Sequence, residues 1–350
     1  MTIEADQLRG TYLDPSLGRT TLAEFWERFD ATALHLRPST RSLYRSQWRQ
    51  HIAPVLGAHP LAAITRTDVE SFLAFMALNG AQPPTQRATR KLLSRLLAGA
   101  VDAGLVGRNV AHGVSTPTVA RREMRFLTAI ETDRLVEATP ERYQALILVA
   151  AYGGLRFGEL CALRVGRFDA LRRRVSIEES IVEVGGKNHA GPTKTSTSRA
   201  VKLPGFVAEK LALHLATQPL GSDGLIFTDP QGGPMRRTNF RRRVWLPAVR
   251  RAGLEPLRFH DLRHTAAALA IASGAHPKAI QERLGHSTIT VTLDRYGHLF
   301  PSLDEELAER LDVMARGAAG SRAPSLPPED RARVIALPVE DREPAADLRS

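Results

Sequence analysis

The feature that most constrains the fold is a break in the sequence at residues 107–125. This segment is rich in Gly, Ser, Thr, Pro and Arg, a composition typical of linkers. Apolar residues with helical spacing come before it, and a mixture of helix and strand patterns comes after it. At 350 residues the chain is long enough for two domains with separate cores. The sequence therefore predicts two domains joined by a linker.

Residues 20–106 are predicted to form a compact, all-helical domain. Apolar side chains recur at helical spacing from position 22 to 29, and a second helix is expected after position 39. Pro54 and Gly57 are expected to end that helix, and Thr67 is expected to cap the next one. A long helix is expected from about position 86 to 104. Residues 1–19 show turn signals without helical spacing, so they precede the first domain as a short arm.

Residues 126–317 are predicted to form a second domain of mixed structure. It opens at Thr128 with a capping-box pattern that ends at Glu131. Strands are expected at 175–177, 181–184 and 200–203, with a polar hairpin loop at 185–198. Most of the remainder shows helical spacing, so the expected fold class is mainly α with a small β-sheet (α+β). Residues 318–350, rich in Pro, Arg and acidic residues, are expected to be disordered.

Composition limits the partners and the compartment. The net charge is +11, which favours a polyanionic partner, although a generally basic proteome is an alternative explanation. The lone Cys161 excludes an internal disulfide, and its apolar helical context predicts a packing role. The polar N-terminus does not resemble a signal peptide, and no apolar run is long enough to span a membrane. We expect a cytoplasmic protein that does not associate with membranes.

Two arginines in the second half suit chemistry on a phosphodiester. Attack on a phosphate adds negative charge to its nonbridging oxygens, which an enzyme can neutralise with fixed cations. Arg156 follows a Gly-Gly pair that allows close backbone approach, and Arg263 lies in the run 260–264, His-Asp-Leu-Arg-His. Each guanidinium stays charged and can hold two phosphate oxygens at once. The ordinary alternative for either residue is a surface ion pair.

The same half supplies a nucleophile and histidines at suitable spacing. Tyr296 lies ten positions after His286, in a stretch with helical spacing. A phenol has a pKa of about 10 and needs a base and cationic surroundings to attack near neutral pH. His260 shares a helix face with Arg263, and His286 follows a glycine that ends a short helix. Packing is the ordinary alternative for Tyr296 and for His286.

Other candidates concern the leaving group and a metal. Lys194 lies at the polar tip between two expected strands, where a general acid can approach a leaving oxygen. Lys187 on the same hairpin is the competing candidate, and Lys202 within a strand is a weaker one. His264 is four positions after His260, but the pair lacks the glutamate of an HExxH motif and no third ligand cluster accompanies it, so we expect no metal site. His264 is predicted to be structural.

Two further stretches indicate contacts with partners. One is a basic helical face suited to DNA phosphates, with a solvated charged face as the alternative for some of its members. The other is an amphipathic helix at 304–314, with Leu307, Leu311 and Met314 on one side, which is predicted to dock on a partner subunit. The basic face comprises Arg236, Arg237, Asn239, Arg241, Arg242 and Arg243.

These motifs resemble the tyrosine recombinase or phage integrase family over roughly residues 20–316. The resemblance implies that Arg156 and Arg263 clamp the phosphate and that Lys194 protonates the leaving oxygen. It implies further roles for four residues: His260 accepts the nucleophile's proton, His286 hydrogen-bonds the phosphate, Tyr296 forms a 3′-phosphotyrosyl bond, and Glu159 orients the site.

The resemblance also implies an assembly. The helical domain resembles a core-binding domain that closes a C-shaped clamp on DNA. Recombination between double-stranded attachment sites in a homotetramer, through a Holliday junction, is implied, with the C-terminal helix docked in trans. Neither metal nor ATP is implied as a cofactor, and excisionase or DNA-bending host proteins are implied as accessory partners.

One departure and two rival functions stand beside this resemblance. Many integrases carry an arm-binding domain before the core-binding helices, whereas here only residues 1–19 precede them, like the end of such a domain. A relaxing enzyme of the type IB topoisomerase kind would use the same chemistry as a monomer. A non-catalytic DNA-binding protein of the same fold is the second rival. The full set of competent positions and the docking helix favour a recombinase.

Overall fold

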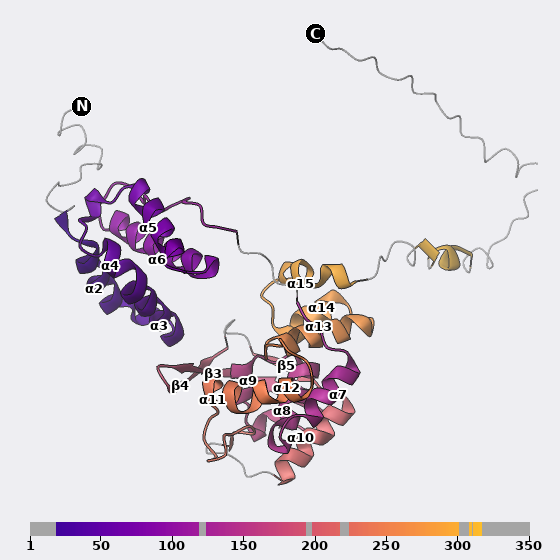
Figure 1. Cartoon of the computed structure of the whole chain (residues 1–350). Helices are drawn as coiled ribbons and strands as arrows, with labels where there is room; N and C mark the ends of the chain where they lie inside the picture. The colour runs from indigo at the N-terminus through magenta and orange to yellow at the C-terminus, as the bar shows by residue number, and fades with distance from the viewer. Residues whose placement is uncertain are drawn as a thin grey trace, which may run out of the picture. The chain divides into compact units, whose positions relative to one another are not determined.

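The computed structural model describes residues 19–118, 124–193, 198–217, 224–300, 308–309 and 311–316 (Figure 1). Within these ranges helices predominate and the strands are short, so the predicted α+β class is confirmed. The apolar side chains form two separate cores. One includes Leu22, Ile52 and Leu96, and the other includes Leu146 and Val249.

The first core is enclosed by helices alone. Trp26 and Trp48 stack in it with ring centroids 4.9 Å apart, which joins the first long helix to the turn that follows the second. The long helices are amphipathic and turn their apolar residues to this core. The helices are α2 (Leu22–Thr32), α3 (Pro38–Gln47), α4 (Ala53–Leu56), α5 (Arg66–Leu78) and α6 (Pro83–Asp102), with short 3-10 turns at Ala33–His35 and Leu61–Ala63.

Pro54 does not end the second helix, as the sequence had predicted. A π-helical turn, η3 (Trp48–Ile52), joins α3 directly to α4, and Pro54 lies in the first turn of α4. The Ala53 N–H donates to the Trp48 carbonyl, five residues back, so the turn is wider than an α-helical one. Proline has no N–H to donate, and the wider turn lets the chain continue as a helix without that hydrogen bond. Only Gly57 follows the end of this helix. Pro247 is accommodated in the same way, because it lies in the first turn of the helix that follows the π-helical turn η7 (Arg241–Trp245).

The predicted cap of α5 is displaced by two residues. Thr65, and not Thr67, is the N-cap, because Thr65 lies three residues before Asp68. The Thr65 N–H donates to the Asp68 carboxylate, and the Asp68 N–H donates to the Thr65 hydroxyl. The Thr128 cap of α7 was predicted correctly, with Glu131 as its partner.

The second core surrounds α8 (Glu141–Gly153), which is buried along almost its whole length. Helices α13 and α10 pack against it. Cys161 is buried here, as predicted. The other helices of this part are α7 (Ala129–Glu137), α9 (Phe157–Cys161), α10 (Gly205–Thr217), α11 (Arg237–Phe240), α12 (Leu246–Arg251), α13 (Asp261–Ala272), α14 (Pro277–Leu284) and α15 (Ile289–Tyr296), with a 3-10 turn at Val165–Arg167.

The strands form two small antiparallel sheets. One has the order β1 (Phe168–Asp169), β2 (Arg174–Ile177), β5 (Arg199–Lys202), and the other pairs β3 (Glu179–Val184) with β4 (Lys187–Pro192). The prediction of a loop over 185–198 was therefore wrong for its first half. Gly185 and Gly186 both have positive φ, which makes a tight two-residue hairpin turn. The sequence of β4 is polar and contains Gly and Pro, so its strand propensity is low and the sequence pattern did not predict a strand there.

The chain from Gly297 onward forms a second unit. It contains a 3-10 turn at Gly297–Leu299 and helical residues at 308–309 and 311–316, where Leu311 and Met314 are exposed. Leu307, the predicted disordered tail and residues 1–18 lie outside the described residues. None of the described helices is long and apolar enough to cross a membrane.

Candidate active site

Arg156 is placed by a sharp turn between two helices. Gly154 ends α8 with φ 73°, and a Cβ there would come within 2.5 Å of a Leu284 methyl group, so only glycine fits. Arg156 is the N-cap of α9, and its N–H donates to the Glu159 carboxylate at 2.9 Å. Its guanidinium also donates to Glu159 at 2.8 Å and remains partly exposed. Glu159 thus fixes both the backbone and the charge of Arg156.

Arg199, which sequence reasoning missed, is the second partner of Glu159. Two of its guanidinium N–H groups donate to the two Glu159 oxygens at 3.1 and 2.6 Å, and its Nε donates to the Arg283 carbonyl at 3.1 Å. Burial favours the neutral form of Glu159, but the hydrogen bonds and charges of Arg199 and Arg156 outweigh burial, so the pKa of Glu159 is lowered. Glu159 is therefore an anion at neutral pH.

Arg263 is held in the protein interior with 2% of its surface exposed. Its Nη1 donates to the Gly154 carbonyl at 2.6 Å, and its Nη2 donates to the Leu284 carbonyl. The guanidinium therefore links the end of α8 to the end of α14. Burial and the neighbouring Arg156 lower the pKa of Arg263 to about 9, which leaves it protonated at neutral pH.

Tyr296 is completely buried at the end of α15, beside two histidines. Its hydroxyl lies 2.8 Å from His264 Nδ1. Its ring stacks on the His286 ring, with centroids 6.4 Å apart, while His286 Nδ1 contacts the Thr292 hydroxyl at 2.9 Å. His264 is thus a direct neighbour of the phenol, beyond the structural role predicted for it.

The electrostatic environment keeps these histidines neutral. Burial is the main cause, and nearby arginines add to it. The pKa of His286 is lowered to about 3, and the pKa values of His260 and His264 are each lowered to about 4. Burial raises the pKa of Tyr296, while Arg263 and Arg295 oppose that rise. The site therefore combines neutral imidazoles with permanent positive charge.

An aromatic cluster lies between the start of α9, directly after Arg156, and the turn that carries His260. Phe157 contacts Phe240 and Phe259, with ring centroids 5.2 and 5.1 Å apart, and Trp245 contacts Phe259 at 5.1 Å. These rings line a cavity of about 460 Å³ that reaches His260. The cluster fixes the start of α9 relative to the turn that precedes α13.

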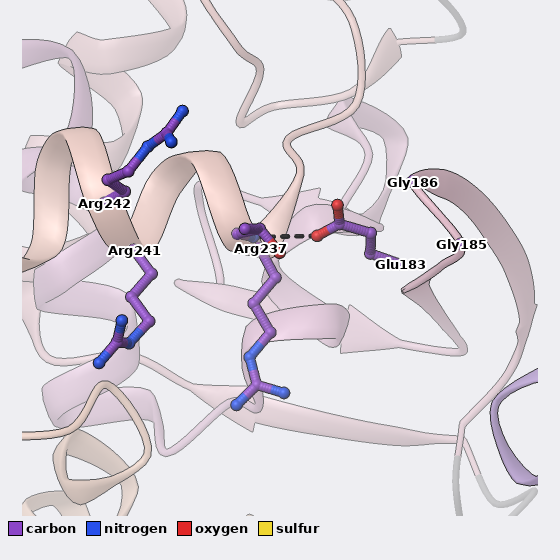
Figure 2. Close-up of a pocket in the computed structure, with 7 residues that line it drawn as sticks. Glu183, Gly185, Gly186, Arg237, Arg241 and Arg242 are labelled. Carbon is purple, nitrogen blue, oxygen red and sulfur yellow. Dashed lines mark hydrogen bonds between the residues drawn. The ribbon is translucent and has the colours of Figure 1, made fainter. Parts of the chain in front are cut away.

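The predicted basic face is exposed along its whole length. Glu183 accepts the N–H of Thr238 at 2.9 Å, which ties the start of α11 to β3 (Figure 2). In Figure 2, Arg237 and Arg241 point to one side and Arg242 points to the other, around a hollow of about 500 Å³. Within the described ranges, none of the five predicted arginines makes an ion pair. The exposed members are Arg236, Arg237, Asn239, Arg241, Arg242 and Arg243.

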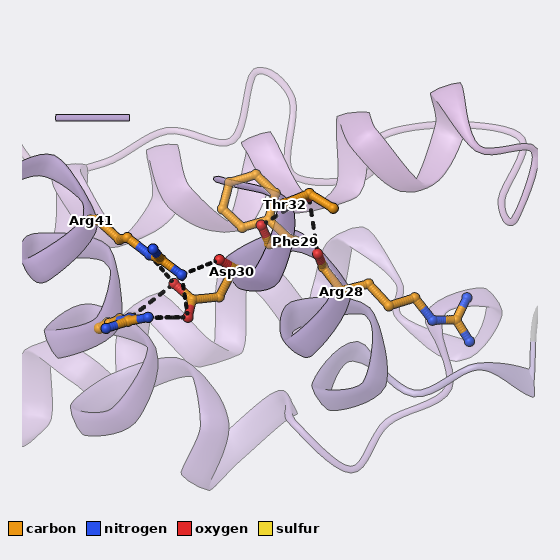
Figure 3. A network of polar contacts seen from close by, with 6 residues as sticks. Arg28, Phe29, Asp30, Thr32 and Arg41 are labelled. Carbon is orange, nitrogen blue, oxygen red and sulfur yellow. Dashed lines mark hydrogen bonds and ion pairs between the residues drawn. The ribbon is translucent and has the colours of Figure 1, made fainter. Parts of the chain in front are cut away.

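Arginines of the helical part are arranged differently. Asp30, on α2, accepts hydrogen bonds from Arg41 at 3.2 Å and from Arg45 at 2.7 Å (Figure 3). These bonds and charges lower the pKa of Asp30 despite some burial, with the Arg45 bond as the largest cause. Asp30 thus joins α2 to α3 and fixes two cations on the α3 surface.

The structure brings together most of the predicted catalytic residues. Arg156, Glu159 and Arg263 meet where α8, α9 and α14 end or begin, and His286 and Tyr296 pack beside them. Lys194 lies outside the described residues. Its competitor Lys187 is exposed at the first position of β4, and Lys202 lies on β5.

Comparison with known proteins identifies the family. The family model described as "Phage integrase family" matches residues 125–302, just over half of the chain, and that of the "Phage integrase, N-terminal SAM-like domain" matches residues 21–77. The chain belongs to the phage integrase family of tyrosine recombinases. It is therefore a site-specific recombinase and a DNA-binding protein.

One relative and two solved structures illustrate this membership. The integrase of Mycobacterium phage FRAT1 is 31% identical over 302 residues, which cover 84% of this chain and 89% of the relative. The Tn1549 transposon integrase in complex with circular intermediate DNA shares the fold, with a TM-score of 0.73, 18% identity and coverage of 83% of this chain and 99% of that one. A lambda integrase dimer bound to a COC′ core site has a TM-score of 0.58, 21% identity and coverage of 78% and 97%.

The contacts that two residues make with the predicted catalytic residues were not foreseen from the sequence. Arg199 stands at the start of a strand, where an arginine is usually a solvated side chain. The available signal was Glu159, a carboxylate in an otherwise apolar short helix, which requires cationic partners once buried. For His264, the spacing to His260 was noticed, but the approach of Tyr296 depends on how α15 packs against α13.

Proposed function

We propose that this integrase cleaves DNA by attack of Tyr296 on a phosphodiester. The attack forms a 3′-phosphotyrosyl bond and releases a 5′-hydroxyl. The 5′-hydroxyl of a second duplex then displaces the tyrosine, and two such exchanges proceed through a Holliday junction. The phosphotyrosyl bond conserves the energy of the broken bond, so the reaction requires neither ATP nor a metal.

The residues divide this chemistry between them. Arg156 and Arg263 hold the nonbridging oxygens and neutralise the charge that develops on them. His260 accepts the proton of Tyr296, and His286 hydrogen-bonds the phosphate. Glu159 orients Arg156. Lys194 is the proposed general acid for the leaving oxygen, with Lys187 as the alternative on the same hairpin.

The proposed assembly contains four subunits and two double-stranded attachment sites. Residues 20–106 form the core-binding domain, which closes a C-shaped clamp around DNA with the catalytic domain, residues 126–317. The basic face at 236–243 contacts phosphates, and the amphipathic helix predicted at 304–314 docks on a neighbouring subunit. Excisionase or DNA-bending host proteins act as accessory partners. A cytoplasmic location follows from the DNA substrate.

One observation carries this proposal. The phenol oxygen of Tyr296 lies against an imidazole, and Arg263 and Arg295 lie near enough to oppose the rise in its pKa. Packing alone does not require a phenol in such surroundings. A tyrosine in a cationic, histidine-lined pocket is suited to attack on a phosphate.

A nicked suicide substrate tests the proposal. Its cleavage releases a short fragment, so religation fails and the covalent adduct accumulates. The wild-type protein is expected to form a protein–DNA adduct that resists denaturation, and Tyr296→Phe is expected to form none while still binding the DNA. An adduct formed by Tyr296→Phe at the wild-type rate would refute the proposed nucleophile.

The two rivals give other outcomes. A relaxing enzyme would remove supercoils from plasmid DNA as a monomer and yield no recombinant product. A non-catalytic DNA-binding protein would yield neither an adduct nor relaxation. Recombination between paired attachment sites supports the proposed integrase alone.

A further inference from the structure

The turn that carries His260 is closed by a buried carboxylate. Asp261, the first residue of α13, is 3% exposed, and its carboxylate accepts the Arg258 N–H at 2.8 Å. The Asp261 N–H donates back to the Arg258 carbonyl, also at 2.8 Å. The Arg258 guanidinium donates to the same carboxylate, from Nε at 3.1 Å and from Nη2 at 2.8 Å. His260 therefore lies inside a turn that is closed both by backbone hydrogen bonds and by an ion pair.

The same arrangement fixes Arg156 at the start of α9. There too an arginine lies three positions before an acid, and its N–H and its guanidinium both donate to that acid, Glu159. The Glu159 N–H returns a hydrogen bond to the Arg156 carbonyl at 2.9 Å. The turn before α9 presents its own arginine to the site, whereas the turn before α13 presents His260, two positions after its arginine. Two turns of the site are thus built in one way.

The ring of His260 depends on this turn for its position. Among the described residues the ring makes no hydrogen bond, and it meets the His264 ring with centroids 5.1 Å apart. The His260 carbonyl accepts the Arg263 N–H at 3.1 Å, so the same turn sets the spacing between these two parts of the backbone. A reactive side chain without hydrogen bonds of its own is oriented by the groups that hold its backbone.

The helix that follows the turn is anchored in the core. The Asp261 carbonyl accepts the Thr265 hydroxyl at 3.0 Å, and that hydroxyl accepts the Leu127 N–H at 3.0 Å. Thr265 is 0% exposed, so these bonds are shielded from solvent. Because α13 is fixed in this way, loosening the turn would move His260 relative to Arg263, which lies on the helix.

We propose that Asp261 and Arg258 are positioning residues, which hold His260 where it takes the proton of Tyr296 during attack. This inference rests on the proposed function, in which His260 is the proton acceptor. Both residues act through His260 and take no part in the proton transfer itself. An acceptor must lie within hydrogen-bond reach of the proton, so a displaced turn lowers the rate of attack.

The first test removes the carboxylate. Asp261→Ala loses every side-chain hydrogen bond of the turn, and we expect it to form the adduct on the suicide substrate about 10-fold more slowly than wild type, because a small displacement of a reacting group has effects of this order. Asp261→Asn keeps an oxygen for the Arg258 N–H, so it should lose only about 3-fold. If the alanine variant does not fold, the asparagine variant takes its place in the comparison that follows.

The matched control is Asp169→Ala. Asp169 also accepts both the N–H and the guanidinium of one arginine, Arg172, at 2.8 and 3.1 Å. This pair lies in the turn between β1 and β2 and has no contact with His260. The control is expected to cleave at the wild-type rate.

The second test asks whether the loss acts through His260. His260→Gln removes the proton acceptor and is expected to slow adduct formation about 100-fold. In that background no acceptor is left to position, so an Asp261 substitution should cause no further loss. A residue that only stabilises the fold would slow both backgrounds by the same factor. Saturating DNA is used throughout, so that the rates compare attack and not binding.

Each outcome has one meaning. Equal losses in the two backgrounds, or cleavage by both Asp261 variants at the wild-type rate, overturn the inference and leave Tyr296 as the nucleophile. Cleavage by His260→Gln at the wild-type rate also overturns it, because His260 would then not be the acceptor. An adduct formed without Tyr296 refutes the proposed function itself.

Discussion

At the scale of single residues, the site is organised by one buried anion. Glu159 receives hydrogen bonds from Arg156 and Arg199, and Arg199 in turn reaches the end of α14. A buried carboxylate with this many cationic partners is stable only while all of them are in place. The charge of Glu159 therefore couples the stability of the fold to the position of Arg156, the proposed phosphate ligand.

Replacement of Glu159 by glutamine should be costly. We expect Glu159→Gln to lower the free energy of unfolding by about 3 kcal/mol at pH 7, because it leaves Arg199 buried without its anion. The pKa of Glu159 is lowered in the folded state, so its contribution is present above the unfolded pKa of about 4.5 and is lost as the pH falls through the folded value. Urea unfolding at pH 7 and pH 4 measures both effects.

The matched control for this prediction is Glu178→Gln. Glu178 pairs with Arg167 at 2.7 Å, but both side chains are exposed. We expect that change to cost less than about 1 kcal/mol. Equal losses in the two variants would contradict the role given to burial.

The neutral histidines predict an acid-sensitive fold. The folded pKa of His286 is about 3, whereas an unfolded histidine titrates near 6.5, so between these values the unfolded chain binds an extra proton. Stability gained from this group is full above pH 6.5 and falls by about 1.4 kcal/mol per pH unit as the pH is lowered. Urea unfolding between pH 5 and 7 should show a shallower pH dependence for His286→Gln than for wild type. Identical slopes would contradict the account.

At the scale of elements, the end of α14 is joined to the rest of the site. Gly285 has φ 63°, and a Cβ on it would lie 3.0 Å from Arg199. Gly274, after α13, also has positive φ, at 79°, but a Cβ there would meet no atom within 4 Å. The two glycines thus share the same backbone requirement and differ in their neighbours.

This pair gives a prediction about coupling. Gly274→Ala should cost about 1 kcal/mol of stability through backbone strain alone and leave cleavage unchanged. Gly285→Ala should cost more and slow adduct formation at least about 10-fold, because it displaces Arg199 and, through Glu159, Arg156. Unfolding and suicide-substrate rates on both variants provide the check. Equal cleavage rates would show that Arg199 does not position the site.

Sequence patterns predicted most elements because their determinants are local. The Thr128 cap, the end of α14 at Gly285 and the strand after position 199 depend on neighbours within a few residues. The passage of the second helix through Pro54 was missed because proline normally ends a helix unless the preceding turn widens. Strand β4 was missed because it is specified by pairing with β3 and by its turn, not by its own propensity.

The candidate site likewise contains residues that local sequence patterns predicted and one that they did not. Arg156, Arg263, His286 and Tyr296 were predicted from ordered motifs, because residue type and spacing alone suggest their chemistry. Arg199 was not, because its role arises only when β5 lies beside α9 and α14.

At the scale of the whole molecule, a large positive charge is distributed unevenly. Arg41 and Arg45 are held by Asp30, whereas the arginines of α11 and η7 make no ion pair in the described part of the chain. Unpaired surface cations are the ones that release counterions when they meet phosphates. The face at 236–243 should therefore contribute to the salt dependence of DNA binding.

Salt titration of DNA binding tests this expectation. Plotting the logarithm of the binding constant against that of the salt concentration, we expect Arg242→Gln to reduce the slope by about 0.9. The control is Arg167→Gln, because Arg167 already pairs with Glu178, and its slope should equal that of wild type. No change for Arg242→Gln would exclude a phosphate contact there.

The central claim is that the phenol of Tyr296 becomes joined to DNA. Mass spectrometry of a protease digest of the trapped adduct measures this directly. The account predicts one nucleotide-bearing peptide, with the nucleotide on Tyr296 through its 3′-phosphate. A nucleotide on any other side chain, or on the 5′ side of the break, would contradict it.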